Sequence, residues 1–317
     1  MPRTAAAQIV RVAGAWVLGF GTWHVAAAER ATPVFATQLE MVFVSVVVKD
    51  AEGRLVNDLK AGDFSVIEDG QAQQIEVFGR AHEPGQDELL SLDLGILFDT
   101  STSMLQELRL SQEAAVRFLE SVPRARDLVT IFFDQDIRFS RYDSENQQGL
   151  FERIWSAKSS GDTALYDAIA VYLSRIRDSP GRKVLVLFTD GEDSTSSLTL
   201  AQTLRLLKAS PVTVYAIGFK GGMLPGSPRA LQAGSTLHAM TKLTGGALFQ
   251  PLASRELSEI FDRILKDLES QYVIGYVPKD LRRDGRYRKL KVSVGAKRMK
   301  VRHREGYVMG EPKAEGG

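Results

Sequence analysis

The sequence of 317 residues contains no cysteine and only four histidines, His24, His82, His238 and His303. The lack of cysteine excludes disulfide bonds, thiolate zinc sites and cysteine nucleophiles, and it leaves the redox compartment undetermined. With so few histidines, the sequence does not favour a hydrolytic triad or a histidine-rich zinc site. No Gly-x-Ser-x-Gly or His-Glu-x-x-His motif is present either. We therefore expect that the chain is not an enzyme.

An excess of charge is also lacking, because 40 Lys and Arg against 39 Asp and Glu give a net charge of +1 at pH 7. This balance gives no electrostatic case for a nucleic-acid partner or an anionic membrane. One local exception is a basic cluster near the end of the chain, made of Arg282, Arg283, Arg286, Arg288, Lys289 and Lys291. We interpret this cluster as a solvated hairpin with positive side chains rather than as a nucleic-acid patch. The hydrophobic content of 44% is that of an ordinary folded protein.

Long hydrophobic runs are lacking except near the N-terminus. Arg3 and Arg11 precede an apolar segment, residues 12–23, that is too short to span a bilayer comfortably. Three consecutive alanines then supply the small residues that a signal peptidase requires. We expect residues 1–28 to be a cleaved signal peptide, with an exported form that begins near Glu29 and is periplasmic, cell-surface or secreted. An uncleaved N-terminal anchor is the alternative, and no later stretch predicts a stable membrane span.

Two β-rich segments flank the middle of the chain. Strands are predicted at residues 42–50, 64–68 and 74–78, with Asp69-Gly70 as a hairpin turn, and again at 271–277, 287–294 and 299–304. Neither set is large enough to be stable alone. We therefore expect an N-terminal β segment, residues 37–80, to pair with a C-terminal β segment, residues 271–308.

Between these segments, residues 90–270 alternate between apolar strands and amphipathic helices. Strands are predicted at residues 92–98, 128–133, 183–188 and 212–217, with 137–140 as an antiparallel partner of 128–133. Helices are predicted at residues 105–119, 150–155, 164–176, 200–209, 237–243 and 257–268. This alternation predicts an α/β fold, a doubly wound, mostly parallel sheet with helices on both faces.

Oxygen-bearing side chains follow two of the predicted strands. Asp99 ends the first apolar strand and is followed by Ser101 and Ser103, and Asp190 follows the strand at residues 183–188. Thr163 precedes a predicted helix. Each alone has an ordinary explanation, as turn chemistry for an aspartate or an N-cap for Thr163. Together they favour a hard-cation site, because Mg²⁺ takes oxygen ligands and because ligands bind beyond the carboxyl ends of strands in such sheets.

These residues resemble the metal-ion-dependent adhesion site of von Willebrand factor type A domains. The family motif Asp-x-Ser-x-Ser is matched by Asp99, Ser101 and Ser103, the family threonine by Thr163 and the family aspartate by Asp190. The resemblance implies a doubly wound sheet with one antiparallel edge strand. It also implies that these five residues bind Mg²⁺ (or Mn²⁺ or Ca²⁺) and that an Asp or Glu of a partner protein completes the metal shell. The flanks resemble bacterial exported proteins with VWFA-related domains.

The chemistry of this set agrees with the resemblance. Two acids and three hydroxyls leave a divalent cation under-neutralised, so one position stays open for an incoming carboxylate. Asp162 and Glu192 are additional acids that either support the site or point to solvent. The segment at residues 220–234 is interpreted as a flexible connection, with a role in specificity as the alternative.

Two other functions stay open. The chain could be a structural subunit of an envelope assembly in which the metal only stabilises the fold. An aspartyl-phosphate-type phosphohydrolase also begins from an acid after a strand, but it requires a second aspartate two residues later, where this chain has Ser101.

Overall fold

The computed structural model describes residues 41–81, 91–122, 125–142, 147–176, 182–220, 222–224, 226–253, 256–295 and 298–310. The predicted signal peptide, residues 1–28, lies outside these ranges. Within them, no helix combines the length and the hydropathy needed to cross a bilayer.

A six-stranded sheet forms the centre of the α/β region, in the order β10-β9-β8-β5-β6-β7. Its strands are β5 (Leu92–Asp99), β6 (Asp127–Phe133), β7 (Ile137–Tyr142), β8 (Arg182–Thr189), β9 (Thr213–Gly218) and β10 (Leu248–Phe249). All neighbours are parallel except β6 and β7, which confirms the predicted antiparallel edge strand. Every residue of β5 is buried, and this explains why its sequence shows no polar–apolar alternation.

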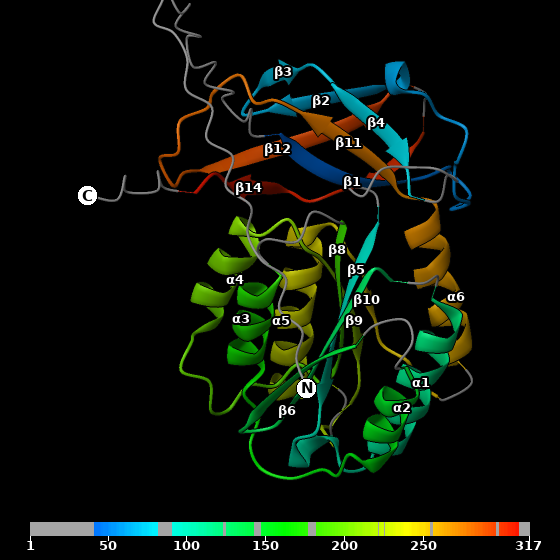
Figure 1. The fold of residues 1–317 in the computed structure, drawn as a ribbon, viewed down its shortest axis with the longest axis vertical. Coiled ribbons are helices and arrows are strands. Elements are labelled where there is room, and N and C mark those ends of the chain that lie inside the picture. The colour runs from blue at the N-terminus through cyan, green and yellow to red at the C-terminus, as the bar shows by residue number, and fades with distance from the viewer. Residues whose placement is uncertain are drawn as a thin grey trace, which may run out of the picture. The chain divides into compact units, whose positions relative to one another are not determined.

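Helices cover both faces of this sheet, as predicted for a doubly wound fold (Figure 1). One face carries α1 (Leu108–Ser121), α2 (Gln147–Ser156) and α6 (Glu256–Glu269), and the other carries α3 (Leu165–Arg175), α4 (Leu200–Ala209) and α5 (Pro228–Thr244). Each face has its own core, with Phe118 of α1 against Phe261 of α6 on the first. On the second, α3 approaches β5 so closely that a Cβ at Gly95 would lie 2.1 Å from the Tyr172 ring.

Helix α5 is longer than the sequence predicts. The predicted helix at residues 237–243 in fact begins at Pro228, so the interpretation of residues 220–234 as a flexible connection is wrong for its second half. The reason is that the first turns of α5 carry polar and small residues, which hide the apolar period. Its start is marked by Ser227, whose Oγ accepts the Ala230 N–H at 3.2 Å, and by proline at the first helical position.

The flanking segments form two four-stranded antiparallel sheets. One contains β1 (Val42–Lys49), β4 (Val77–Arg80), β11 (Tyr272–Tyr276) and β13 (Lys300–Arg302), and the other contains β2 (Phe64–Glu68), β3 (Gln71–Gln73), β12 (Tyr287–Val294) and β14 (Gly306–Val308). Each sheet combines strands of the N-terminal and the C-terminal segment, because β1 pairs with β11 and β2 pairs with β12. The two sheets share one apolar core that includes Val44, Val66, Ile274 and Val292. The predicted β module of N- and C-terminal segments is confirmed.

The predicted hairpin is right at its turn and wrong in its returning strand. Asp69 and Gly70 have φ values of 45° and 84°, as an Asp-Gly hairpin turn requires. The strand that returns is β3, directly after the turn, and β4 then pairs with β11 of the other sheet. The predicted returning strand at residues 74–78 is therefore wrong in its pairing and its start, because residues 74–76 cross between the sheets and β4 begins only at Val77. Strand β14 was not predicted at all.

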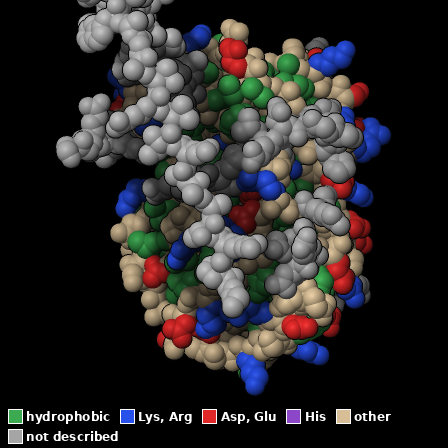
Figure 2. Space-filling model, in the orientation of Figure 1, with side chains coloured by type: hydrophobic (Ala, Val, Ile, Leu, Met, Phe, Trp, Pro, Cys, Tyr) green, Lys and Arg blue, Asp and Glu red, His purple; other side chains and the backbone are tan. Residues whose placement is uncertain are grey.

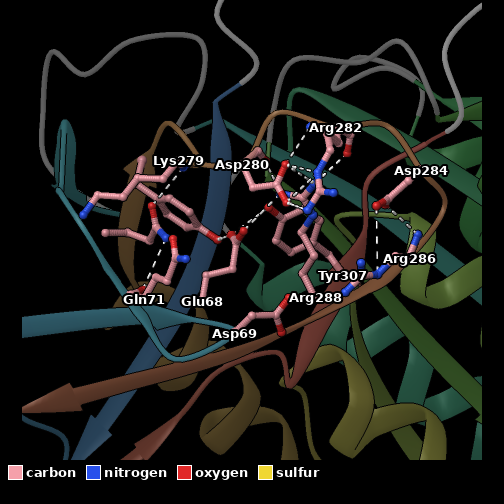
Figure 3. Close-up of polar contacts among 12 residues, drawn as sticks. Glu68, Asp69, Gln71, Lys279, Asp280, Arg282, Asp284, Arg286, Arg288 and Tyr307 are labelled. Carbon is pink, nitrogen blue, oxygen red and sulfur yellow. Dashed lines mark hydrogen bonds and ion pairs between the residues drawn. The ribbon is translucent and has the colours of Figure 1, made fainter.

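A buried polar cluster connects the strands of this β module (Figure 3). Glu68 accepts hydrogen bonds from the hydroxyls of Tyr276 at 2.6 Å and Tyr307 at 2.8 Å, and its Oε1 lies 3.2 Å from Nη1 of Arg288. Arg288 is only 3% exposed, so the interpretation of the basic cluster as fully solvated is wrong for this residue. Elsewhere Lys and Arg lie interspersed with Asp and Glu on the face drawn in Figure 2, in keeping with the net charge of +1.

The β module contacts the end of the central sheet where its parallel strands begin. Asp267, near the end of α6, lies 3.2 Å from Lys49 of β1 and 2.6 Å from Arg302 of β13. Arg182, the first residue of β8, lies 2.5 Å from Gln271, which precedes β11. These contacts are at the opposite end of the strands from Asp99 and Asp190.

Candidate metal centre

The five predicted ligands come together at the carboxyl edge of the central sheet. Asp99 is the last residue of β5 and Asp190 directly follows β8, and these two strands are parallel neighbours. Ser101 and Ser103 lie in the turn that follows β5. Thr163, from the loop before α3, lines a cleft of about 580 Å³ together with Ser103.

Asp99 is fully buried and every carboxylate oxygen has a partner. Its Oδ1 accepts the backbone N–H of Ser101 at 2.9 Å and the Ser101 hydroxyl at 2.6 Å, and its Oδ2 accepts the Thr189 hydroxyl at 2.6 Å. Burial first, and then the nearby charge of Asp190, raises the pKa of Asp99 to about 7 against these hydrogen bonds. The structure therefore places Asp190 close enough for its charge to raise the pKa of Asp99.

Asp190 has one oxygen that is not satisfied. Its Oδ1 accepts the backbone N–H of Glu192 at 2.9 Å, whereas its Oδ2 is buried without a hydrogen-bond partner among the described residues. Burial is the main cause that raises the pKa of this carboxyl, and the Glu192 N–H and the nearby Ser103 side chain act in the opposite direction. An unpaired buried carboxylate oxygen is costly, and its position beside three hydroxyls fits a ligand of a cation.

Thr163 does not cap the following helix. The N-cap position of α3 is Ala164, and it makes no side-chain cap. The backbone of Thr163 is fixed instead by the loop after β8, since its N–H donates to the Ser194 hydroxyl at 3.0 Å and its carbonyl accepts the Ser194 N–H at 2.9 Å. The ordinary N-cap explanation is thus wrong, and the Thr163 side chain lines the cleft.

The loops of the site are connected through their backbones. The Ser160 N–H donates to the Thr100 carbonyl at 2.8 Å, and the Thr102 N–H donates to the Gly161 carbonyl at 3.0 Å. The Ser159 hydroxyl donates to the Ser101 carbonyl. The Ser101 and Ser103 hydroxyls lie 3.0 Å apart. These contacts connect the loop that carries Ser101 and Ser103 to the loop that carries Thr163.

Comparison with known proteins identifies the family to which this α/β region belongs. Residues 93–262 match the family described as von Willebrand factor type A domain. The chain belongs to the von Willebrand factor type A domain family. No curated protein matches it.

Several solved structures are similar to the chain at low identity. An aerotolerance-related membrane protein from Bacteroides fragilis is 15% identical, with a TM-score of 0.46, and covers 56% of this chain and 99% of its own. A von Willebrand factor type A protein from Catenulispora acidiphila is 13% identical, with a TM-score of 0.46 and coverages of 86% and 74%. The vWF domain of the type V pili tip protein Mfa5 from Porphyromonas gingivalis is 12% identical, with a TM-score of 0.44, and the match covers 56% of this chain and 94% of that domain.

The donor set of this von Willebrand factor A domain suits a hard cation. Two carboxylates and three hydroxyls offer only oxygen, which Mg²⁺, Mn²⁺ and Ca²⁺ accept and which a soft metal does not favour. No group of three or more His, Cys, Asp or Glu that could hold a metal exists in the described part of the chain. A metal at this edge would therefore need the hydroxyls, and the unsatisfied Oδ2 of Asp190 fits such an ion.

Sequence analysis missed the residues that orient the ligands. Thr189 positions Asp99, and Ser194 positions Thr163. The only signal for Thr189 in the sequence is its hydroxyl directly before Asp190. The residue to which this hydroxyl donates, Asp99, lies 90 positions away in the sequence. Gly191 directly follows Asp190. It has a φ of 85°, and a Cβ there would lie 2.8 Å from Leu237 and 2.9 Å from the Ala233 carbonyl oxygen.

The two additional acids differ in their surroundings. Glu192 lies in the cleft and forms an ion pair with Arg229, whose Nη2 is 2.6 Å from Oε2. Asp162 lines the same cleft and is exposed. Arg229 belongs to the first turn of α5, in the segment that was interpreted as a flexible connection. Its positive side chain lies at the rim of the cleft.

Proposed function

We propose that the chain is an exported, divalent-metal-dependent protein-binding module of the adhesion type. Asp99, Ser101, Ser103, Thr163 and Asp190 would hold Mg²⁺ (or Mn²⁺ or Ca²⁺), and the ion would bind an Asp or Glu carboxylate of a partner protein. The observation that carries this proposal is the buried Asp190 Oδ2, which has no hydrogen-bond partner among the described residues and belongs to a set of five oxygen donors.

The coordination number, rather than the charge, supports capture of a further oxygen ligand. Two carboxylates balance the formal charge of a divalent cation, so the expectation of an under-neutralised cation is wrong, but Mg²⁺ prefers six oxygens. Five protein groups leave room for another oxygen ligand. The cleft of about 580 Å³ over Ser103 and Thr163 gives a partner side chain access to that position.

The state of Asp99 argues against the phosphohydrolase alternative. An attacking carboxylate must reach its substrate, whereas Asp99 is 0% exposed and its two oxygens accept hydrogen bonds from Ser101 and Thr189. We therefore propose a binding role without catalysis. Export rests on the N-terminal segment outside the described residues and remains a prediction.

The proposal is tested by partner capture from the envelope fraction of the native host. Immobilised protein is incubated with Mg²⁺ or with EDTA, and Asp99→Ala is compared with Asp262→Ala, which changes an exposed acid on α6. We expect a partner that is retained by wild type and by Asp262→Ala in Mg²⁺ and is lost with EDTA or Asp99→Ala. EDTA-resistant capture would sink the metal mechanism. Metal-dependent melting without any capture would instead support the purely structural alternative.

A further inference from the structure

A basic pocket lies at the antiparallel edge of the central sheet, between β6, β7 and the end of α2. Its volume is about 220 Å³, which is below the roughly 300–1,000 Å³ of small-molecule sites. Three cations and one acid form its charged lining, namely Arg138, Arg153, Lys158 and Asp134, and the five candidate metal ligands are not among its described lining residues. The pocket therefore combines an excess of positive charge with room for one small group.

The acid of the basic pocket is already paired. Asp134 accepts hydrogen bonds from both terminal nitrogens of Arg138, at 3.2 and 2.6 Å, and from the Asp136 N–H at 2.7 Å. Arg138 also donates to the Thr100 hydroxyl at 3.0 Å, so the pair is held in place. Because Asp134 and Arg138 balance each other, the excess of two positive charges belongs to Arg153 and Lys158.

Arg153 and Lys158 have no acid to pair with. Neither forms an ion pair with any described residue, and the guanidinium of Arg153, including its buried Nε, has no hydrogen-bond acceptor among those residues. This guanidinium lies 5.1 Å from the centre of the Phe132 ring, a cation–π contact that orients it. A partly buried arginine without an acceptor is unfavourable, and an anion in the pocket would supply one.

The end of α2 does not oppose an anion at this place. Carbonyl groups at a helix C-terminus carry partial negative charge, which would repel one. Here the carbonyls of Ile154 and Ala157 accept hydrogen bonds from Nε2 of Gln112 at 2.8 and 3.0 Å, and the Arg153 carbonyl accepts the Ser156 hydroxyl at 3.0 Å. Since these carbonyls are occupied, the positive side chains determine the potential in the pocket.

We infer that the basic pocket binds a phosphate group, either as free phosphate or as the terminal phosphoryl group of a larger molecule. A phosphate group carries about −1.5 to −2 charges at pH 7, which matches the two unpaired cations, whereas a carboxylate carries a single charge. Arg and Lys are the usual partners of phosphate oxygens, and the hydroxyl residues Ser156 and Ser160 also line the pocket. This inference is independent of the proposed function, because it requires neither a metal nor a protein partner.

The probe is inorganic phosphate, titrated by calorimetry into metal-stripped protein at constant ionic strength, so that no divalent cation can bind it. We expect one saturable site in wild type, and binding about ten-fold weaker or worse in Arg153→Gln and in Lys158→Gln. Arg263→Gln is the matched control, because Arg263 of α6 is also an arginine over an aromatic ring, 5.0 Å from the centre of Phe249, and does not line the pocket. This control should bind phosphate as wild type does.

Glycerol 3-phosphate distinguishes the two sources of the phosphate group. Its competition with phosphate would support the site and assign it to the phosphoryl group of a larger molecule, and saturable phosphate binding without competition would support a site for free phosphate. The inference would be overturned by absence of saturable binding in wild type, by unchanged binding in Arg153→Gln and Lys158→Gln, or by equal weakening in Arg263→Gln. Because Lys158 is exposed, its variant should fold as wild type does, and equal melting temperatures check this.

Discussion

Asp99 and Asp190 are both buried at the carboxyl ends of adjacent parallel strands, and burial first and then the charge of Asp190 raise the pKa of Asp99. Two buried acids in this relationship are unfavourable without a counter-charge. A divalent cation between the two carboxylates would supply that counter-charge. The expected pH dependence of stability follows from this pair.

The stability of the metal-free protein should fall as pH rises. Asp99 has a pKa of about 7 in the folded chain and 3.8 as the ordinary value, so the folded state holds this proton more tightly than the unfolded state. The resulting stabilisation is complete below about pH 4 and is lost as pH rises towards 7, by a free energy on the order of 4 kcal/mol. Melting in EDTA at several pH values measures it. Asp99→Asn should flatten the profile and Asp262→Asn should not, and a wild-type profile that rises from pH 5 to 7 would contradict the account.

Thr189→Val should weaken metal binding as well as stability. The substitution removes the donor to Asp99 Oδ2 at nearly constant volume, and the expected loss of unfolding free energy is about 1–3 kcal/mol. Thr203→Val is the control, because Thr203 is equally buried and its hydroxyl donates to the Thr199 carbonyl away from the site. Calorimetry should show reduced Mn²⁺ affinity for Thr189→Val alone. Equal affinities in the two variants would mean that Thr189 does not position Asp99.

Gly191→Ala should disturb the turn that carries Asp190. The new Cβ would meet Leu237 and the Ala233 backbone, in addition to the strain of a φ of 85°. Gly53→Ala isolates the second effect, since Gly53 has the same φ and nothing lies within 4 Å of its Cβ position. We expect Gly53→Ala to lose about 1–2 kcal/mol and Gly191→Ala to lose more, together with metal affinity. Denaturant unfolding would show the difference, and equal losses would mean that the packing at Gly191 is unimportant.

Glu68→Gln should destabilise the protein without changing the candidate metal centre. It leaves Arg288 with Asp280, 3.6 Å away, as its remaining ionic partner, for an expected loss of about 1–3 kcal/mol. Glu52→Gln is the control, since the pair of Glu52 with Arg54 is exposed and should contribute less than about 1 kcal/mol. Mn²⁺ affinity should be unchanged in both. A weaker affinity in folded Glu68→Gln would show that the β module and the metal centre are coupled.

Much of the α/β region could be predicted because its signals are local. The fully apolar β5 and the amphipathic α6 each report their burial within a few residues, and Asp99, Ser101 and Ser103 lie on one short turn. The start of α5 could not be found in this way, because polar and small residues on its exposed and cleft-lining faces hide the period.

What the sequence did not reveal depends on distant partners. Arg288 looks like one of six basic surface residues until the fold brings Glu68, 220 positions away, against it. The crossing from β3 to β4 is likewise decided by pairing with β11, which no local pattern reports. Thr189 shows the same limit at the candidate metal centre, since its hydroxyl donates to Asp99 at the end of a neighbouring strand.

The most direct test of the account is titration of EDTA-stripped protein with Mn²⁺ by calorimetry, with wild type, Asp190→Ala and Asp262→Ala in parallel. Asp190→Ala removes the unsatisfied buried oxygen, so it should abolish binding without harming the fold. We expect one saturable site in wild type and in Asp262→Ala, and none in Asp190→Ala. Absence of binding in wild type, or equal binding in Asp190→Ala, would contradict it.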